Sequence, residues 1–151
     1  MRRRDLVRRA ATVSFIRCNG KASSGERRDF MMTKINLDQK FGLFDEQWRP
    51  KVIAAMNRQE ITLVEVQGEF PWHRHEEEDE FFLVWKGRFR VEFRDHIVEM
   101  SPGEGVVVPR GVEHRTCADE EAEILLFEPS GTVNTGNVVH ADYTAPIGIV
   151  I

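Results

Sequence analysis

Three histidines and one glutamate carry the chemistry that this sequence offers. They stand in two glycine-framed motifs, Gly68-x4-His73-x-His75-x4-Glu80-x6-Gly87 and Gly103-x5-Pro109-x-Gly111-x2-His114. Alternate residues of a strand lie on one face, so His73 and His75 are expected to point the same way. Glu80 follows a short acidic turn and can return on the neighbouring strand, whereas His114 can join them only if the sheet closes on itself.

Three imidazoles and one carboxylate form a ligand set for a divalent transition metal. The set offers no thiolate, and it suits Fe(II), Mn(II), Ni(II), Cu(II), Co(II) or Zn(II). Four protein ligands leave about two positions of an octahedral shell open, whereas a structural zinc site would be closed. The pattern therefore indicates a metal that can polarise a substrate, activate water, or bind oxygen beside a substrate.

Other side chains of the same types compete for this role. A His-x-His pair by itself is more often a surface or core feature than a ligand pair, and the acidic run at 76–78 is expected to be solvated. Asp79 is the rival of Glu80, but Glu80 is preferred because it leads into Phe82 and Val84 in the same phase. Three further residues are not expected to bind the metal: His96 in a turn, His140 in the tail, and Cys117, which is out of phase with His114.

Short apolar stretches of alternating polarity fill the chain from residue 59 onward. Strands are expected at 52–56, 61–66, 80–85, 88–94, 97–100, 106–108, 114–118 and 123–128. Ahead of them, Asn36 or Asp38 can cap a short helical turn with Leu37, Phe41 and Phe44 on one side. Short strands at near-regular spacing predict an all-β sandwich or barrel. A tail at 129–151 is expected to run over the surface.

The two motifs resemble the paired motifs of the cupin superfamily, whose members are small β-barrel jelly rolls. The resemblance covers about residues 58–128, and all four ligand positions match. Two details depart from the family pattern: four residues instead of five separate Gly68 from His73, and Ala118 stands where the second motif ends in Asn. The resemblance implies a double-stranded β-helix with a short N-terminal helical or irregular segment, and a metal bound at the four motif positions. It leaves the reaction open, because one fold hosts many chemistries.

The composition limits the class of partner. The length of 151 residues suits one domain. Residues 1–33 carry nine Lys/Arg and three Asp/Glu, a net charge of +6. Residues 34–151 carry twelve Lys/Arg and twenty-two Asp/Glu, a net charge of −10, so the whole chain has a net charge of −4. The acidic remainder disfavours a nucleic-acid partner, and no stretch reaches the ~20 apolar residues that span a bilayer. Cys18 and Cys117 are expected to be free thiols in a reducing compartment, the cytoplasm.

The basic N-terminal stretch, residues 1–33, has three interpretations. It can be an over-long start, with Met31 or Met32 as the natural first residue. It can be a targeting segment, although the apolar run at 10–16 contains Thr12 and Ser14 and makes a poor signal peptide. It can also be a basic arm that binds an anionic partner. In each case the cupin-like domain is expected to span residues 34–151.

The phase of the strands indicates the kind of ligand. Phe82 and Val84 are expected to line the interior face on which Glu80 lies, and Thr116 shares the face of His114. No Lys or Arg is expected to point inward, which disfavours a phosphosugar. The pocket therefore favours a small uncharged or aromatic molecule that chelates the metal through oxygens.

Two classes of function fit this pattern. The first is a metal-dependent enzyme, either a dioxygenase-like oxidoreductase or an isomerase or lyase. The second is a non-catalytic protein that binds or senses a small ligand and uses the metal as an anchor. A mannose-6-phosphate isomerase-like activity rests on family analogy alone. A second interior carboxylate would favour the enzyme, and none is evident from the sequence.

The segment 80–85 is apolar on both faces, with Phe81, Leu83 and Trp85 expected to face away from the pocket. A strand that is apolar on both faces is covered on both faces. The cover can be the segment 41–48 of the same chain or a second protomer. Because cupins often pack such sheets together, the resemblance favours a two-fold homodimer.

Overall fold

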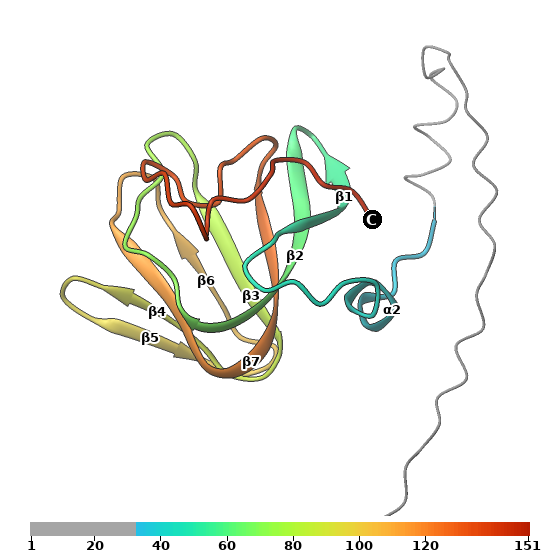
Figure 1. Cartoon of the computed structure of the whole chain (residues 1–151), viewed down its shortest axis with the longest axis horizontal. Helices are drawn as coiled ribbons and strands as arrows, with labels where there is room; N and C mark the ends of the chain where they lie inside the picture. Colours follow the sequence, from blue (N-terminus) through green and yellow to red (C-terminus); the bar gives the residue numbers. More distant parts are fainter. Residues whose placement is uncertain (1–32) are drawn as a thin grey trace, which may run out of the picture. The chain divides into compact units, whose positions relative to one another are not determined.

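The computed structural model describes residues 33–151, in which alternating apolar and polar residues build a predominantly β structure (Figure 1). The elements are α2 (Leu37–Phe41), β1 (Lys51–Met56), β2 (Gln59–Glu69), β3 (Glu80–Lys86), β4 (Phe89–Phe93), β5 (Ile97–Met100), β6 (Gly105–Val108) and β7 (His114–Pro129). The all-β prediction is confirmed. The three interpretations of the N-terminal stretch concern residues 1–32, which lie outside the described part.

Helix α2 is a short helix of five residues that begins at an asparagine cap. The Asn36 side chain accepts a hydrogen bond from the backbone N–H of Gln39 at 3.1 Å. This bond satisfies one of the N–H groups that the first helical turn leaves without a partner. Of the two possible caps, the structure uses Asn36, and Asp38 lies in the first turn, where the helix dipole favours an acidic residue.

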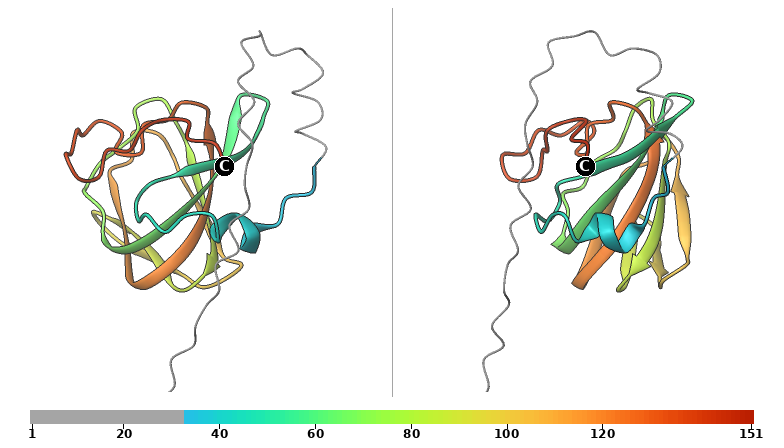
Figure 2. Two further views of the ribbon diagram at one scale, coloured as in Figure 1. Left: turned by 45° about the vertical axis from the view of Figure 1, so that its right-hand side comes forward. Right: turned by 90° about the vertical axis from the view of Figure 1, so that its right-hand side faces the viewer.

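Strand β7 connects the two parts of the antiparallel sheet. Its first part pairs with β4 and its second part with β3, while β2 pairs with it from Cys117 to Pro129. The sheet order is β1-β2-β7-β3-β6, and the hairpin of β4 and β5 is attached through β7. In Figures 1 and 2 these strands curve around a common interior. The two strands expected at 114–118 and 123–128 are therefore one strand, because β2 pairs along both.

The interior of this curved sheet is an apolar core built from alternate residues of four strands. Its members are Val64 and Val66 of β2, Phe82 and Val84 of β3, Phe89 and Val91 of β4, and Ala118, Ala122, Ile124 and Leu126 of β7, with Met100 and Val108 beside them. The period of two along each strand places these side chains on one face. The core fills one part of the interior and leaves the polar ligands at its edge.

The outer face of the sheet carries a second, smaller apolar cluster. Phe41, Ile53 and Leu63 are buried in it, and Leu37 and Phe44 pack against it. The segment around α2 therefore covers part of the outer face, which is the intrachain cover considered above. It does not cover all of it: Trp85 remains 37% exposed and Val107 56% exposed.

The turn between β3 and β4 requires a glycine. Gly87 has a φ of +81°, and a Cβ at this position would lie 2.8 Å from the carbonyl oxygen of Glu121. A side chain would be strained in that conformation and would also displace the backbone of β7. The glycine of the first motif therefore allows β3 and β4 to approach β7 closely.

Residues 130–151 are tied to the barrel by hydrogen bonds. The N–H of Asn137 donates to Arg74 O at 3.0 Å, and the N–H of Arg74 donates to Asn137 Oδ1 at 2.9 Å. The N–H of Val52 donates to Ile149 O at 2.7 Å, and Thr135 is fully buried. The segment expected to run over the surface thus packs along one end of the barrel (red in Figure 2).

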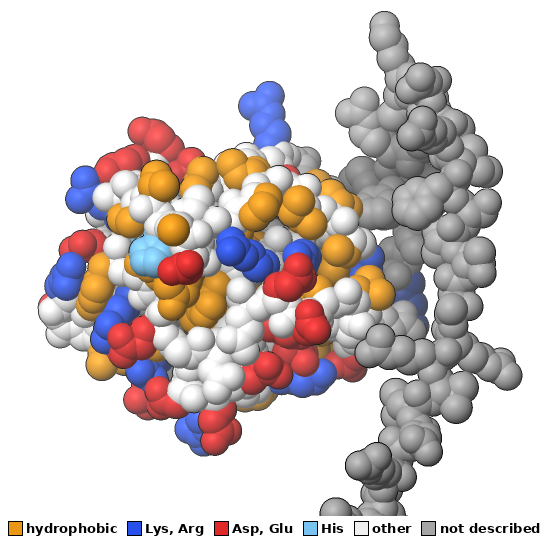
Figure 3. Space-filling view, in the orientation of Figure 1, with side chains coloured by type: hydrophobic (Ala, Val, Ile, Leu, Met, Phe, Trp, Pro, Cys, Tyr) orange, Lys and Arg blue, Asp and Glu red, His pale blue; other side chains and the backbone are white. Residues whose placement is uncertain are grey.

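The surface carries charges of both signs. On the face shown in Figure 3, basic and acidic side chains of the described residues lie interspersed, with apolar groups between them. Within residues 33–151, no helix is long and apolar enough to cross a membrane.

Candidate metal centre

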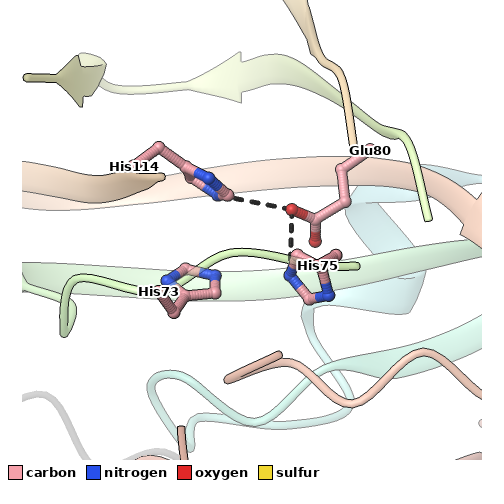
Figure 4. A group of neighbouring side chains, drawn as sticks. All are labelled: His73, His75, Glu80 and His114. Carbon is pink, nitrogen blue, oxygen red and sulfur yellow. Dashed lines mark ion pairs between the residues drawn. The ribbon is translucent and has the colours of Figure 1, made fainter. Parts of the chain in front are cut away.

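Two backbone contacts place the histidines together. The backbones of His73 and His114 form an isolated antiparallel bridge. The N–H of His73 donates to His114 O, with an N···O distance of 3.0 Å, and the N–H of His114 donates to His73 O at 2.9 Å. The N–H of Gly111 donates to His75 O at 2.6 Å. His73 and His75 were expected on a strand, but they lie in the extended connection between β2 and β3. The extended backbone still projects both rings to the same side (Figure 4).

The four predicted ligands converge in one buried group (Figure 4). One ligand atom from each of His73, His75, Glu80 and His114 lies within 4.8 Å of all the others. Glu80 Oε2 is 3.2 Å from His75 Nε2 and 3.4 Å from His114 Nε2. All four residues are at most 3% exposed. The closing of the sheet thus brings His114 to the three ligands of the first motif.

Backbone carbonyls fix the tautomers of two rings. His73 Nδ1 lies 2.9 Å from Pro71 O, and His114 Nδ1 lies 3.0 Å from Val112 O. A carbonyl oxygen only accepts, so each Nδ1 carries the proton and donates it. The lone pair is then on Nε2, the atom that faces the other ligands. Such a second hydrogen bond is the usual way in which proteins orient a metal-binding imidazole.

The group contains polar atoms that the protein itself leaves unsatisfied. His75 Nε2, Glu80 Oε2 and His114 Nε2 are buried and have no hydrogen-bond partner, so the short contacts to Glu80 lack hydrogen-bond geometry. Burying such atoms without partners costs ~1–3 kcal/mol each. A divalent cation among them would satisfy all three at once. The residues therefore fit a metal ion.

The local electrostatics prepare two ligands for a cation. Burial opposes ionisation of Glu80, but favourable electrostatic contacts with the nearby His114 and His75 rings outweigh it and lower the pKa of Glu80 to about 2. Burial, together with repulsion from His114, lowers the pKa of His73 to about 4. Near neutral pH, Glu80 is therefore a carboxylate and His73 a neutral imidazole, the forms that bind metal.

Known proteins are similar to this chain in sequence and in fold. The family model for the cupin domain matches residues 60–128. Uncharacterized protein YdbB of Bacillus subtilis is 31% identical over 87 residues, covering 50% of this chain and 77% of the relative. The crystal structure of a cupin-2 domain containing protein from Shewanella frigidimarina is 46% identical, with a TM-score of 0.62, covering 63% of this chain and 93% of that chain. The chain belongs to the cupin superfamily.

A further solved cupin-like neighbour is protein NMB1881 from Neisseria meningitidis. It is 29% identical, with a TM-score of 0.60, and the match covers 65% of this chain and all (100%) of that chain. The family match ends at residue 128, so the C-terminal segment of this cupin lies beyond it.

The competing candidates lie elsewhere in this cupin. Asp79 Oδ1 accepts a hydrogen bond from the N–H of Arg110 at 2.8 Å and is exposed. The exposed His96 stacks on Phe93 and pairs with Asp95. The remaining two candidates are His140, which lies against Tyr143, and Cys117, a buried free thiol whose pKa is raised to about 11, chiefly by burial.

A cavity of about 40 Å³ adjoins the metal centre. Its lining consists of His73 and Glu80, the apolar residues Pro50, Val64, Val66, Phe82, Phe89 and Leu126, the aromatic residues Trp48 and Phe70, and the polar residues Thr116, Glu128 and Asn134. Phe82 and Thr116 thus lie where the sequence placed them. Val84 does not line the cavity, because it is one step deeper along β3, fully buried against the core.

Sequence reasoning missed Glu128 as an interior residue. Its side chain is only 7% exposed. Burial, and then repulsion from Glu80 and Glu60, raises the pKa of Glu128 well above its usual range. A signal was present: Glu128 continues the inward phase of Ile124 and Leu126. It was hidden because the intervening residues of β7 are apolar too.

Proposed function

We propose that this cupin is a metal-dependent enzyme that binds a divalent transition metal through His73, His75, Glu80 and His114. Its substrate is a small organic molecule that chelates the metal through oxygens, and its reaction is an oxidation of the dioxygenase type or an isomerase or lyase reaction. The observation that carries the proposal is the group of buried, unsatisfied ligand atoms. The metal is Fe, Mn, Ni, Cu, Co or Zn.

The residues around the metal have separable tasks. A bound metal supplies Lewis acidity and open positions for oxygen ligands. Pro71 and Val112 hold the rings of His73 and His114 through their carbonyl oxygens, so the ligands need no rearrangement. Glu80 balances part of the metal charge. The apolar wall excludes water, which strengthens each polar contact inside the cavity.

The cavity chemistry argues against a phosphosugar. Recognition of a phosphate group normally uses Arg or Lys. No Arg or Lys is among the described residues that line the cavity. We therefore do not assign a sugar-phosphate isomerase activity to this cupin.

Metal analysis tests the proposal directly. Purified wild-type protein is expected to carry about one equivalent of a divalent transition metal, measured by plasma mass spectrometry. The double variant with His75→Ala and His114→Ala is expected to carry none, because it keeps only two of four ligands. His96→Ala, at an exposed histidine, is the matched control and keeps the metal. A double variant with wild-type metal content would show that the ligand assignment is wrong.

A second candidate function is ligand binding without catalysis. It is favoured by the small cavity, about 40 Å³, which offers few polar groups besides the ligands. Chelating hydroxy acids and diols, incubated with the metal-loaded protein in air and under argon, separate the two functions. Turnover of any of them supports the enzyme. Saturable binding without turnover in either atmosphere supports a binding or sensor protein.

A further inference from the structure

Glu128 is a carboxylic acid in the cavity wall that the metal centre does not use. It follows Ile124 and Leu126 on the inner face of β7, and it is 7% exposed. A buried carboxyl group costs stability unless it is paired. A leucine at this position would simply extend the apolar core. Groups that break the local rule in this way are expected at functional sites.

The position of Glu128 puts it beside any molecule bound to the metal. Its side chain lies near that of the metal ligand Glu80. Both residues line the same cavity, whose volume is about 40 Å³. A ligand that binds the metal from this cavity therefore has Glu128 in the surrounding wall.

The other polar groups of the wall are less able to meet such a ligand. Asn134 is already used: its Nδ2 donates to Tyr143 O at 2.8 Å, and its Oδ1 accepts from the N–H of Ala145 at 2.9 Å. Thr116 offers a single hydroxyl group. Glu128 offers two oxygens, and either protonation state of a carboxyl group accepts a hydrogen bond. The rest of the wall is apolar or aromatic.

We propose that Glu128 is a specificity-determining residue that accepts a hydrogen bond from a ligand hydroxyl group next to the chelating group. This inference rests on the proposed metal function and names its substrate class: small hydroxylated chelators, such as hydroxy acids with a further hydroxyl group. A ligand with an alkyl group at that place cannot form this hydrogen bond and brings an apolar group against the carboxyl group. Sites built around a hydrogen bond reject such analogues.

Glycerate and lactate form a matched pair of probes. They share the 2-hydroxycarboxylate group that chelates a metal, and they differ in CH₂OH against CH₃. The cobalt(II)-loaded protein reports their binding through its visible spectrum. Wild-type protein is expected to bind glycerate about tenfold more tightly than lactate, the value of one hydrogen bond to a carboxyl group.

Variants at two positions of the cavity wall show which residue recognises the additional hydroxyl group of glycerate. Glu128→Leu should abolish the preference for glycerate, and Glu128→Gln should keep much of it because the amide oxygen still accepts. Thr116→Val is the matched control and should leave the preference unchanged. Equal binding of the two acids by the wild type, or a preference that survives Glu128→Leu or disappears in Thr116→Val, overturns the role of Glu128.

Failure of the proposed function gives a different result. If cobalt binds stoichiometrically but neither acid changes its spectrum, the metal has no open position for a chelating ligand. That result overturns the proposed function and this inference together. A spectral change of equal size and affinity with both acids overturns the inference alone.

Discussion

Glu80 and Glu128 show how strongly the environment separates two residues of one type. Burial disfavours the charge on both. Favourable electrostatic contacts with His114 and His75 outweigh burial at Glu80 and lower its pKa to about 2, whereas repulsion from Glu80 adds to burial at Glu128 and raises its pKa. Pairs of carboxyl groups with pKa values pushed apart are typical of enzyme sites. The separation of the two pKa values therefore supports the proposed enzyme function.

The raised pKa of Glu128 predicts a stabilising substitution in the metal-free protein. Between the ordinary pKa of about 4.5 and the higher folded value, the unfolded state releases a proton that the folded state keeps. The free energy of unfolding therefore falls as pH rises through this window, by about 1.4 kcal/mol for each unit of pKa difference. Glu128→Gln removes the ionisation and is expected to be more stable than the wild type at neutral pH.

Urea denaturation of both metal-free proteins between pH 4 and pH 8 measures this effect. The two proteins should differ least at the acidic end, where the carboxyl group is mostly protonated in both states. The gap should then widen in favour of the variant as pH rises. A wild type that gains stability over the variant with rising pH would mean that Glu128 is ionised and paired in the folded protein.

The ligands could be predicted from the sequence because their spacing is local and their frame is specific. His73, His75 and Glu80 lie within eight residues of one another, between two glycines. Glu128 could not be predicted in the same way. Leu125 and Phe127 alternate with Ile124 and Leu126, so both faces of that strand are apolar and the inner face cannot be read from polarity.

At the scale of elements, the alternation of apolar residues located the strands, but it did not show their connections. One strand, β7, replaces the two that were expected, since β2 pairs with β7 on both sides of the polar stretch at 119–121, where the register shifts. The role of residues 130–151 was also hidden. This segment is held by backbone and Asn or Thr hydrogen bonds rather than by a periodic apolar face.

The C-terminal segment supports the metal centre through Asn137. Its side chain accepts from the N–H of Arg74, the residue between His73 and His75. Gly136, the residue before Asn137, also lies close to the metal centre. A Cβ added at Gly136 would lie 3.3 Å from His75 Cε1. Loss of an outer support of this kind typically costs ~10–100-fold in metal affinity. Asn137→Ala is therefore expected to weaken cobalt(II) binding about tenfold.

Competition with a chromophoric chelator measures this affinity. Thr132→Ala is the matched control, because it removes a side-chain hydrogen bond of the same segment, to Pro129 O at 2.7 Å, away from the ligands. It should leave the cobalt affinity unchanged. Equal affinities for Asn137→Ala and the wild type would show that the barrel alone positions the histidines.

At the scale of the whole molecule, one apolar area is left on the outside of the sheet. Phe81 of β3 pairs with Val107 of β6, and its ring lies over Gly105. Leu83 is half-buried beside them, and Trp85 donates a hydrogen bond to Asp38 of α2 at 3.2 Å. The helix thus covers the edge of this area, and Val107 remains 56% exposed. An area of this kind is suited to a two-fold interface with a second copy.

We therefore predict that the protein forms a homodimer through this face, and that Leu83→Glu yields monomers or insoluble protein. A two-fold interface uses the same surface of both copies, so it would bury two unpaired charges, and each burial is unfavourable. Val139→Glu is the matched control, since Val139 is 93% exposed in the C-terminal segment, and it should remain dimeric. Size-exclusion chromatography with light scattering measures the mass. A wild type that is a stable monomer at micromolar concentration would leave the segment around α2 as the only cover of the sheet, and Leu83→Glu would then act on the stability of the monomer alone.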